Sequence, residues 1–371
     1  MKTLSFSNCP LDPTLGSGKT RLAWAAGLRG LGHDVENWDV VRLLRPLDRR
    51  LGFRLGLAFS ARRAIARADL AGIDLVEFFG VEFWWATRWL RRRKRRPLIV
   101  AHTDGFELLA YQRLGPVEPK ARGRLERWAP FFDLGRRSVQ AFADADRFVA
   151  LCRLDTEDAV RRGLFTREQA ATVSPGLDAE YLGRPFVERR DDTVVVFGSW
   201  VERKGVGHVA AVINRFLAAH ASWRLLIVGA SGQEAAIRAA IGGAFAARIE
   251  VAPKLPVAEI GRRLDRAKIL FSASEYEGFG LAIAEAMGCG CAAVVTPTGF
   301  GGDLVPGVDA QVCGFGDEDA MFATLHRLAG DDETRERIAR AGWHRVQSLA
   351  WPEAVRHLAE IYLRWLGERS S

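Results

Sequence analysis

The chain has 371 residues, of which 48% are hydrophobic and 26% charged, and its formal net charge is +8. This length suits two domains of ordinary size, and the composition is that of a soluble globular protein able to bury a sizeable core. No run reaches the roughly 18 consecutive apolar residues of a membrane span, and five scattered cysteines without a C-x-x-C pair argue against a disulfide framework.

Cysteine usage and the start of the chain favour a cytoplasmic protein. The first apolar run is short and strand-like, so we expect no signal peptide, and an odd number of cysteines suits a reducing compartment. The positive charge favours acidic partners such as phosphates, nucleotides or an anionic membrane surface, but does not choose among them. No nucleic-acid partner is expected.

Strand-like and helix-like segments alternate along the first half of the chain. Strands are predicted at Met1–Asn8, Asp74–Phe79, Leu98–Ala101 and Arg147–Leu151, and helices at Ser17–Leu31 and Asp155–Arg162.

The same alternation restarts in the second half. Strands are predicted at Thr193–Phe197, Arg224–Val228, Ile249–Val251, Ile269–Ser272 and Ala292–Thr296, and helices near Val206–Ala219, Gln233–Ala240, Val257–Ala267 and Glu353–Trp365.

Repeated strand–helix–strand units imply an α/β chain with parallel sheets covered by helices on both faces. Residues 184–192 are charged, contain Pro185 and are predicted to link two such sheets. We therefore expect two doubly wound Rossmann-like domains, residues 1–186 and 187–349, with a tail at 350–371.

The most informative stretch is 274–295, which holds two glutamates eight residues apart. Glu277 falls in a loop before a short helix, and Glu285 falls inside that helix. Gly278 and Gly280 let backbone N–H groups approach an anion, and the helix N-terminus favours negative charge. Two acids around an anion site suit a ligand with both phosphate and hydroxyl groups, such as a nucleotide sugar. The alternative is an ordinary amphipathic helix with one exposed and one capping acid.

The block Ser-x-x-Glu-Gly-Phe-Gly and Glu-Ala-Met-Gly-Cys-Gly resembles the E-x7-E signature of retaining GT-B glycosyltransferases of the family-four, glycosyl transferases group 1 type. This resemblance implies two domains facing a central cleft, with the C-terminal helix crossing back to the first domain. It also implies that Glu285 holds the ribose hydroxyls of a nucleotide-diphosphate sugar and that Glu277 hydrogen-bonds the sugar ring. The backbone of Gly278, Phe279 and Gly280 would assist at the diphosphate.

Residues 194–205 resemble the strand and loop that place cations on the donor diphosphate in this family. Lys204 fits the family's lysine position, and Arg203 fits a frequent second cation. A departing diphosphate gains negative charge, so cations placed beforehand lower the barrier. Many relatives have Gly-Arg-Leu where this chain has Gly198-Ser199-Trp200, so one diphosphate arginine is absent; either Arg203 compensates or diphosphate binding is weaker. Outside this context, an Arg-Lys-Gly turn is often a solvated loop.

Two further positions are assigned to the nucleotide by resemblance alone. Gly229 ends a strand in the manner of the family's Val-Gly-x-Gly segment, and Leu255 falls where relatives hold the base through backbone contacts. A glycine after a strand is by itself weak evidence, because glycine often marks the turn at a strand end.

In the first half, His102 ends an apolar strand and matches the family's cleft-facing histidine, which touches the donor sugar near the acceptor. A lone histidine is more often structural. Asp104 is a second candidate, for orienting the acceptor. Gly16 falls where relatives have a glycine-rich loop near the donor phosphate; Pro13 replaces the first glycine that a P-loop requires, so a P-loop kinase is not predicted.

Asp144 and Asp146 match a D-x-D metal motif, but their setting resembles the family's lead-in to a strand, and we assign no metal and no cofactor. Lys204, Arg203 and a helix N-terminus compensate the diphosphate charge in this interpretation.

Residues 78–96 combine aromatic residues with a run of arginines and leave two interpretations open. An amphipathic helix with a basic end could make a peripheral contact with an anionic membrane, at the inner face, and reach a lipid-linked acceptor. Alternatively, the aromatic residues pack in the domain and the arginines are simply solvated.

The sequence thus predicts a retaining glycosyltransferase whose acceptor is a sugar, a lipid-linked group or a small molecule. Two alternatives remain: a GT-B-like sugar epimerase or phosphorylase, and a nucleotide-sugar-binding protein with a degenerate site. Intact Glu277, Glu285 and Lys204 argue against degeneracy, and Ser199 argues mildly for it.

Overall fold

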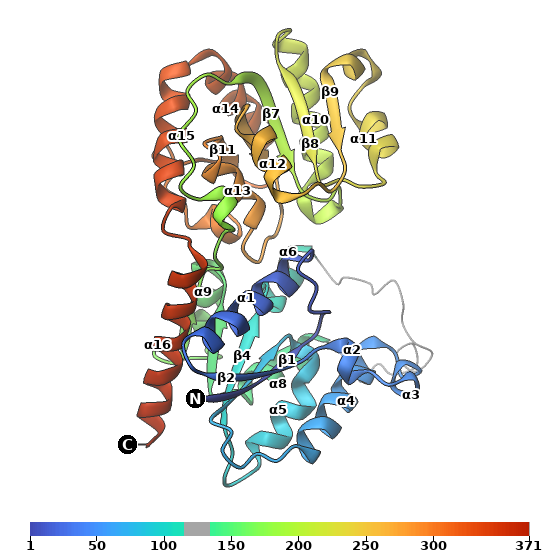
Figure 1. Cartoon of the computed structure of the whole chain (residues 1–371). Helices are drawn as coiled ribbons and strands as arrows, with labels where there is room; N and C mark the ends of the chain where they lie inside the picture. The colour runs from blue at the N-terminus through green and yellow to red at the C-terminus, as the bar shows by residue number, and fades with distance from the viewer. Residues whose placement is uncertain (115–133, 371) are drawn as a thin grey trace. The chain divides into compact units, whose positions relative to one another are not determined.

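The computed structural model describes residues 1–114 and 134–370, and the chain divides into two compact units. The first unit comprises Met1–Gly176 and Trp351–Ser371, and the second comprises Leu177–Ala350. Each is built on a parallel sheet with helices packed around it (Figure 1). These two parallel sheets confirm the predicted two-domain α/β architecture.

The first unit has a six-stranded sheet of order β2-β1-β3-β4-β5-β6, in which every pair is parallel. Its strands are β1 (Lys2–Ser7), β2 (Asp34–Trp38), β3 (Leu75–Phe79), β4 (Leu98–Thr103), β5 (Arg147–Ala150) and β6 (Ala170–Thr172). Its described helices are α1 (Gly16–Gly30), α2 (Val40–Leu43), α3 (Pro46–Arg49), α4 (Phe53–Arg67), η1 (Val81–Phe83), α5 (Trp84–Arg91), α6 (Glu107–Leu114), α8 (Leu134–Ala143), α9 (Arg153–Arg161) and α16 (Trp351–Ser370).

The second unit has a six-stranded parallel sheet of order β12-β11-β10-β7-β8-β9. Its strands are β7 (Asp191–Phe197), β8 (Arg224–Val228), β9 (Ile249–Ala252), β10 (Ala267–Ser272), β11 (Ala292–Val295) and β12 (Gln311–Val312). Its helices are η2 (Ala179–Tyr181), η3 (Glu202–Lys204), α10 (Val206–Ala219), α11 (Glu234–Ala240), η4 (Gly243–Arg248), α12 (Val257–Leu264), α13 (Leu281–Gly288), η5 (Gly299–Gly302), α14 (Glu318–Gly330) and α15 (Asp332–Val346).

The central strands are apolar and buried along their whole length. Every residue of β3, β4 and β11 is buried. Such continuous burial is expected for parallel strands that are covered by helices on both faces. The short apolar runs of the sequence are therefore the cores of the two sheets.

In each sheet there is one point at which successive strands are added on the opposite side of the first strand. In the first unit β2 and β3 lie on opposite sides of β1, and in the second unit β8 and β10 lie on opposite sides of β7. In open parallel sheets, ligands bind outside the carboxyl ends of the strands at such a switch point. The two places to search are therefore the ends of β1 and β3 and the ends of β7 and β10.

The predicted linker at 184–192 is packed into the second unit. Arg184 pairs with Asp265, and Arg190 donates to the carbonyl oxygens of Ala267 (3.1 Å) and Cys289 (2.8 Å). Two arginines of this segment are therefore bound within the second unit, although Glu188 and Arg189 are exposed. The chain passes between the units at residues 176–177 and 350–351, whereas the sequence placed the first boundary at 186–187.

The final helix, α16, belongs to the first unit, as the sequence predicted. It packs on α1, where a Cβ added to Gly27 would lie 2.4 Å from Val355, so only glycine allows this approach. Tyr362 and Trp365 on the same helix have no exposed surface. Among residues 1–114 and 134–370, no helix combines the length and the apolar character needed to cross a bilayer.

Candidate functional site

A buried carboxylate with two cations lies at the switch point of the second unit. Glu277, in the loop after β10, is 5% exposed and forms an ion pair with Lys204, which ends η3 after β7. Ser274 Oγ donates to Glu277 Oε1 (2.7 Å), and Arg203 Nη1 lies 3.4 Å from Oε2. The Glu277 backbone N–H donates to Thr298 Oγ1 (2.9 Å), which fixes the loop. The structure therefore brings together three of the residues that the sequence assigned to the donor.

The electrostatic balance favours an ionised Glu277. Burial would raise the pKa of this carboxyl, but the charges of Lys204 and Arg203 outweigh it and hold the pKa below its usual range. The Arg203 side chain is 48% exposed and that of Lys204 is 18% exposed, so both cations retain surface for a second anion.

Two glycines shape the loops that carry these residues. Gly205 follows Lys204 with φ of +64°, and a Cβ there would lie 2.0 Å from the Ala273 carbonyl oxygen. Gly280 has φ of +92° and precedes α13. Neither conformation is readily available to a residue with a side chain. The Phe279 side chain is buried and stacks on Phe300 at 5.1 Å, so this residue has only its backbone to offer a ligand.

Glu285 lies on α13 and is 8% exposed. The pKa of the Tyr181 phenol is raised first by the burial of that phenol and next by the charge of Glu285. The Glu285 carboxylate therefore lies close to η2. The burial of Glu285 does not fit the alternative of an ordinary amphipathic helix with an exposed acid at this position, and its binding role stays a prediction.

The remaining donor candidates lie at the same edge of the sheet. Gly229 directly follows β8, has φ of +88°, and a Cβ there would be 3.6 Å from Gly198, which follows β7. Leu255 is half-buried in the loop after β9. The segments that follow β7, β8, β9 and β10, together with Glu285 on α13, therefore carry the residues assigned to the nucleotide in this unit.

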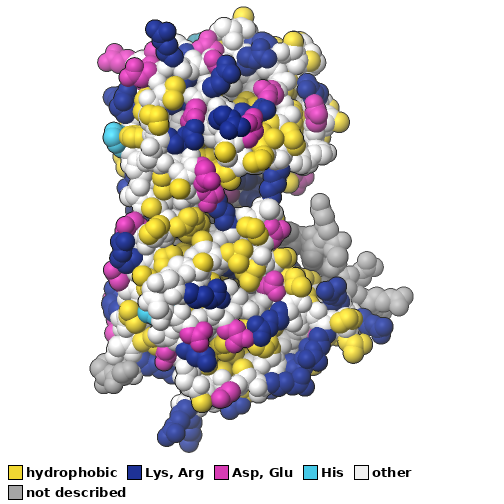
Figure 2. Space-filling view, viewed as in Figure 1, with side chains coloured by type: hydrophobic (Ala, Val, Ile, Leu, Met, Phe, Trp, Pro, Cys, Tyr) yellow, Lys and Arg dark blue, Asp and Glu magenta, His cyan; other side chains and the backbone are white. Residues whose placement is uncertain are grey.

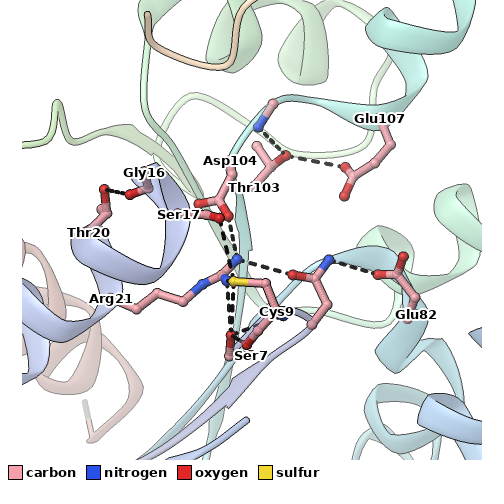
Figure 3. A network of polar contacts seen from close by, with 12 residues as sticks. Ser7, Cys9, Gly16, Ser17, Thr20, Arg21, Glu82, Thr103, Asp104 and Glu107 are labelled. Atoms are coloured by element: carbon pink, nitrogen blue, oxygen red, sulfur yellow. Dashed lines mark hydrogen bonds and ion pairs between the residues drawn. The ribbon is translucent and has the colours of Figure 1, made fainter. Parts of the chain in front are cut away.

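The first unit has a second polar network at its own switch point (Figure 3). Arg21 of α1 is buried, forms an ion pair with Asp104 after β4, and donates to Asn8 Oδ1 (3.2 Å) after β1. Asn8 Nδ2 in turn donates to Glu82 Oε2 (3.0 Å) after β3. Gly16 begins α1 and accepts a hydrogen bond from Thr20 (2.9 Å). Sequence reasoning singled out Asp104 and Gly16 but missed Arg21, Asn8 and Glu82.

Glu107 also belongs to this network, and its carboxyl is a weaker acid than an ordinary glutamate. Burial, followed by the charge of Glu82 and, more weakly, of Asp104, raises its pKa to about 8. Thr103 Oγ1 donates to its Oε2 (3.3 Å). Near neutral pH this carboxyl is therefore mostly protonated and can donate a hydrogen bond.

His102 is not at a ligand-accessible surface, and its predicted contact with the donor sugar is not supported. The side chain is 1% exposed and lies between Phe79, at 4.3 Å between ring centroids, and Trp24, at 5.6 Å. Its Nε2 is 2.6 Å from Tyr362 Oη and 3.4 Å from Glu77 Oε2. Here the strand-end histidine anchors α16 to the sheet.

Asp146 of the D-x-D pair has a structural role. Asp146 forms ion pairs with Arg91 and Arg96 and accepts the Ile99 backbone N–H (3.0 Å). Within residues 1–114 and 134–370, no group of three His, Cys, Asp or Glu side chains is arranged to hold a metal ion.

Residues 191–331 match the family model described as glycosyl transferases group 1. The chain is 26% identical over 248 residues to the GDP-mannose:cellobiosyl-diphosphopolyprenol alpha-mannosyltransferase of Xanthomonas campestris, a match covering 64% of this chain and 60% of that protein. It is 27% identical over 292 residues to the D-inositol 3-phosphate glycosyltransferase 1 of Catenulispora acidiphila, covering 71% and 68%. This chain thus aligns with only about 60% of the length of the first of these relatives.

Solved structures are similar over nearly the whole chain. Sucrose-phosphate synthase from Thermosynechococcus elongatus superposes with a TM-score of 0.74 at 15% identity, covering 99% of this chain and 100% of that one. Anabaena Alr3699/HepE in complex with UDP has a TM-score of 0.68 at 16% identity, covering 97% and 99%. The chain therefore has the two-domain α/β fold of GT-B glycosyltransferases, and its segment 191–331 matches the glycosyl transferases group 1 family.

Proposed function

We propose that the protein is a retaining glycosyltransferase that moves a sugar from a nucleotide-diphosphate donor to an acceptor. The observation that carries this proposal is the buried Glu277 carboxylate with Lys204 and Arg203 beside it, at the switch point of the second unit. All three residues lie within the segment that matches the glycosyltransferase family. The names of two comparison proteins support the donor class, since one uses GDP-mannose and another was solved with UDP.

The donor is assigned to the second unit. Lys204 and Arg203 bind the diphosphate, and the backbone at 278–280 assists. Glu277 accepts a hydrogen bond from the sugar ring, and Glu285 accepts from the ribose hydroxyls. In this arrangement the diphosphate competes with Glu277 for the Lys204 ammonium.

The nucleotide base is assigned to the strand ends near Gly229 and Leu255. Both positions offer mainly backbone groups, so few side chains are available to read the identity of the base.

In the transfer step, the bond between the anomeric carbon and the phosphate oxygen breaks, and a new bond forms from an acceptor oxygen to the same carbon. Negative charge accumulates on the departing diphosphate, where Lys204 and Arg203 stabilise it. A phosphate oxygen takes the acceptor's proton on the same face, so configuration is retained without a protein nucleophile. Lys204, Arg203 and the N-terminus of α13 are assigned to compensate the diphosphate charge, and no divalent ion or other cofactor is assigned to this step.

The acceptor is assigned to the first unit, at the network around Asp104. His102 is enclosed, so orientation of the acceptor hydroxyl falls to Asp104 and its neighbour Glu107. Carboxyl groups at strand ends suit a polyhydroxylated acceptor, whether a sugar, a lipid-linked glycan or a small polyol. Gly16, at the start of α1 in this unit, is still assigned to the loop that lies near the donor phosphate.

The test is product analysis with a panel of UDP- and GDP-sugars, each with and without sugar acceptors. We expect release of nucleoside diphosphate that depends on acceptor, and a product whose anomeric proton coupling in NMR matches that of the donor. An altered sugar nucleotide without acceptor would identify an epimerase, and a sugar phosphate formed with inorganic phosphate would identify a phosphorylase. Binding without any turnover would identify a nucleotide-sugar-binding protein.

A further inference from the structure

A pocket of about 700 Å³ lies on the first unit. It is formed by α4, α5 and the residues after α5, with one contribution from α8. Its lining consists of three tryptophans, four arginines and a glutamine: Trp84, Trp85, Trp89, Arg62, Arg88, Arg92, Arg93 and Gln140. We refer to it as the Trp–Arg pocket.

The aromatic side of the pocket reaches solvent. Trp84 and Trp85 stack at 5.8 Å, and Trp85 is 40% exposed. Phe59 of α4, which is 39% exposed, contacts Trp85 at 5.9 Å between ring centroids. Large aromatic side chains seldom stay this exposed in a cluster unless the surface binds something.

The cationic side of the pocket has few acidic partners. The Arg93 and Arg62 guanidinium groups lie over the Trp89 ring, at 3.9 and 4.9 Å from its centroid. Among the described residues, no ion pair engages Arg62, Arg93 or the exposed Arg88 and Arg92, whereas their neighbours Arg91 and Arg96 both pair with Asp146.

Asp144 is an acidic residue whose carboxyl interacts electrostatically with arginines of this pocket. Its pKa is raised, mainly by burial, although Arg88, Arg91 and Arg92 act in the opposite direction. A single carboxyl does not neutralise four arginines, so the surface stays strongly positive. Lys and Arg side chains gather over the part of this unit that holds α4 and α5 (Figure 2).

Exposed tryptophans among arginines match the chemistry of a bilayer interface. Indole rings favour the headgroup region, where one edge is apolar and the other hydrated, and juxtamembrane arginines are attracted to anionic lipids. A soluble phosphate would use the arginines but leave the aromatic cluster in water. We therefore propose that the Trp–Arg pocket docks this unit on an anionic phospholipid bilayer, with a lipid phosphodiester seated among its arginines and Trp85 and Phe59 entering the interface.

The proposal does not rest on sugar transfer, because the pocket shares no residue with the donor or acceptor assignments. The experiment is co-sedimentation of the full chain with vesicles of phosphatidylcholine alone or with about 30 mol% phosphatidylglycerol, an anionic lipid that gives the surface a negative potential. Each arginine near an anionic surface contributes about 1 kcal/mol. The triple substitution Arg88→Gln, Arg92→Gln and Arg93→Gln should therefore lower the partition coefficient on anionic vesicles about a hundredfold.

A matched control carries the same loss of charge on the second unit, at the exposed positions Arg189→Gln, Arg224→Gln and Arg345→Gln. This control should bind anionic vesicles nearly as the wild type does, and turnover of soluble substrates should be unchanged in both variants. Trp85→Ala should weaken binding with the arginines intact.

Three results would overturn the proposal. They are equal binding of wild type to neutral and anionic vesicles, undiminished binding by the pocket variant, and binding to single-stranded oligonucleotide or soluble glycerophosphate in place of vesicles. Loss of transfer activity with normal vesicle binding would instead count against the proposed function alone.

Discussion

The Lys204 ammonium and the Glu277 carboxylate form an ion pair between loops that follow two neighbouring parallel strands, β7 and β10. The two residues are 73 positions apart in the sequence, and the sheet alone brings them together. An ion pair at this position holds a cation in place, with part of its surface free for a phosphate. The following predictions test what the pair does.

Lys204→Ala should lower turnover on the order of a hundredfold or more, because the departing diphosphate loses a preplaced cation in a partly buried site. Steady-state kinetics with a saturating donor would measure this loss. Lys2→Ala is the matched control, since Lys2 is 49% exposed and makes only a long surface pair with Asp34 (3.8 Å). Near-normal turnover in Lys204→Ala would remove that lysine from the mechanism.

The two glutamates should respond differently to charge removal. Glu285→Gln should raise the inhibition constant of the nucleoside diphosphate about tenfold or more, because a charge-assisted hydrogen bond to ribose is lost. Glu277→Gln should leave that constant unchanged or lower it, since Lys204 is freed for the diphosphate, while turnover of the complete donor falls. Competitive inhibition assays would separate these effects, and equal losses of nucleoside diphosphate affinity in both variants would contradict the division of roles.

Gly205→Ala should destabilise the second unit by about 1–3 kcal/mol or more. Alanine would have to adopt a left-handed conformation, and its Cβ would meet the Ala273 carbonyl oxygen. Gly207→Ala, two residues further and inside α10, is the control. No atom lies within 4 Å of the added Cβ there, and alanine favours a helix, so stability should be unchanged or slightly higher. Thermal unfolding would compare the two, and equal stability would disprove the steric argument.

Tyr362→Phe should lower stability by about 1–3 kcal/mol without changing donor kinetics. The lost hydroxyl donates to the buried Glu77 carboxylate and contacts His102 Nε2, so a buried charge would be left less well satisfied. Calorimetric unfolding and donor KM would be measured together. Unchanged stability with reduced turnover would return His102 to the catalytic site.

Glu107 should make stability fall as pH rises. Its pKa is about 8 in the folded protein against an ordinary value of 4.5, so the folded state binds the proton more tightly. Its contribution is fully present below pH 4.5, is lost progressively as pH rises towards 8, and is constant above that.

The measurement is the difference in unfolding free energy between Glu107→Gln and wild type as a function of pH. This difference should grow in favour of the variant between pH 4.5 and 8, whereas Glu360→Gln, at an exposed position on α16, should show no such trend. A flat difference would indicate an ordinary carboxyl.

The parts of the site that could be predicted from sequence are those that follow a strand directly. Lys204 and Glu277 each come shortly after an apolar run, and parallel strands present their carboxyl ends at one edge of the sheet. The glycine-rich loops around them restrict the backbone in ways that are visible locally.

The parts that could not be predicted depend on partners far along the chain. His102 ends a strand as a site residue would, but Tyr362, 260 residues later, encloses it. Arg21 pairs with Asp104 across 83 residues. Arg190 resembles a solvated linker residue in the sequence. Its hydrogen-bond acceptors are carbonyl oxygens of β10 and of the residue after α13, which lie far along the chain.

The most direct test of the donor site is calorimetric titration of the wild type and of Lys204→Ala with a panel of nucleoside diphosphates. We predict that at least one of them binds the wild type at one site per chain, and that the substitution weakens this binding at least about tenfold. If none binds, or if Lys204→Ala binds as tightly as the wild type, the donor assignment is contradicted.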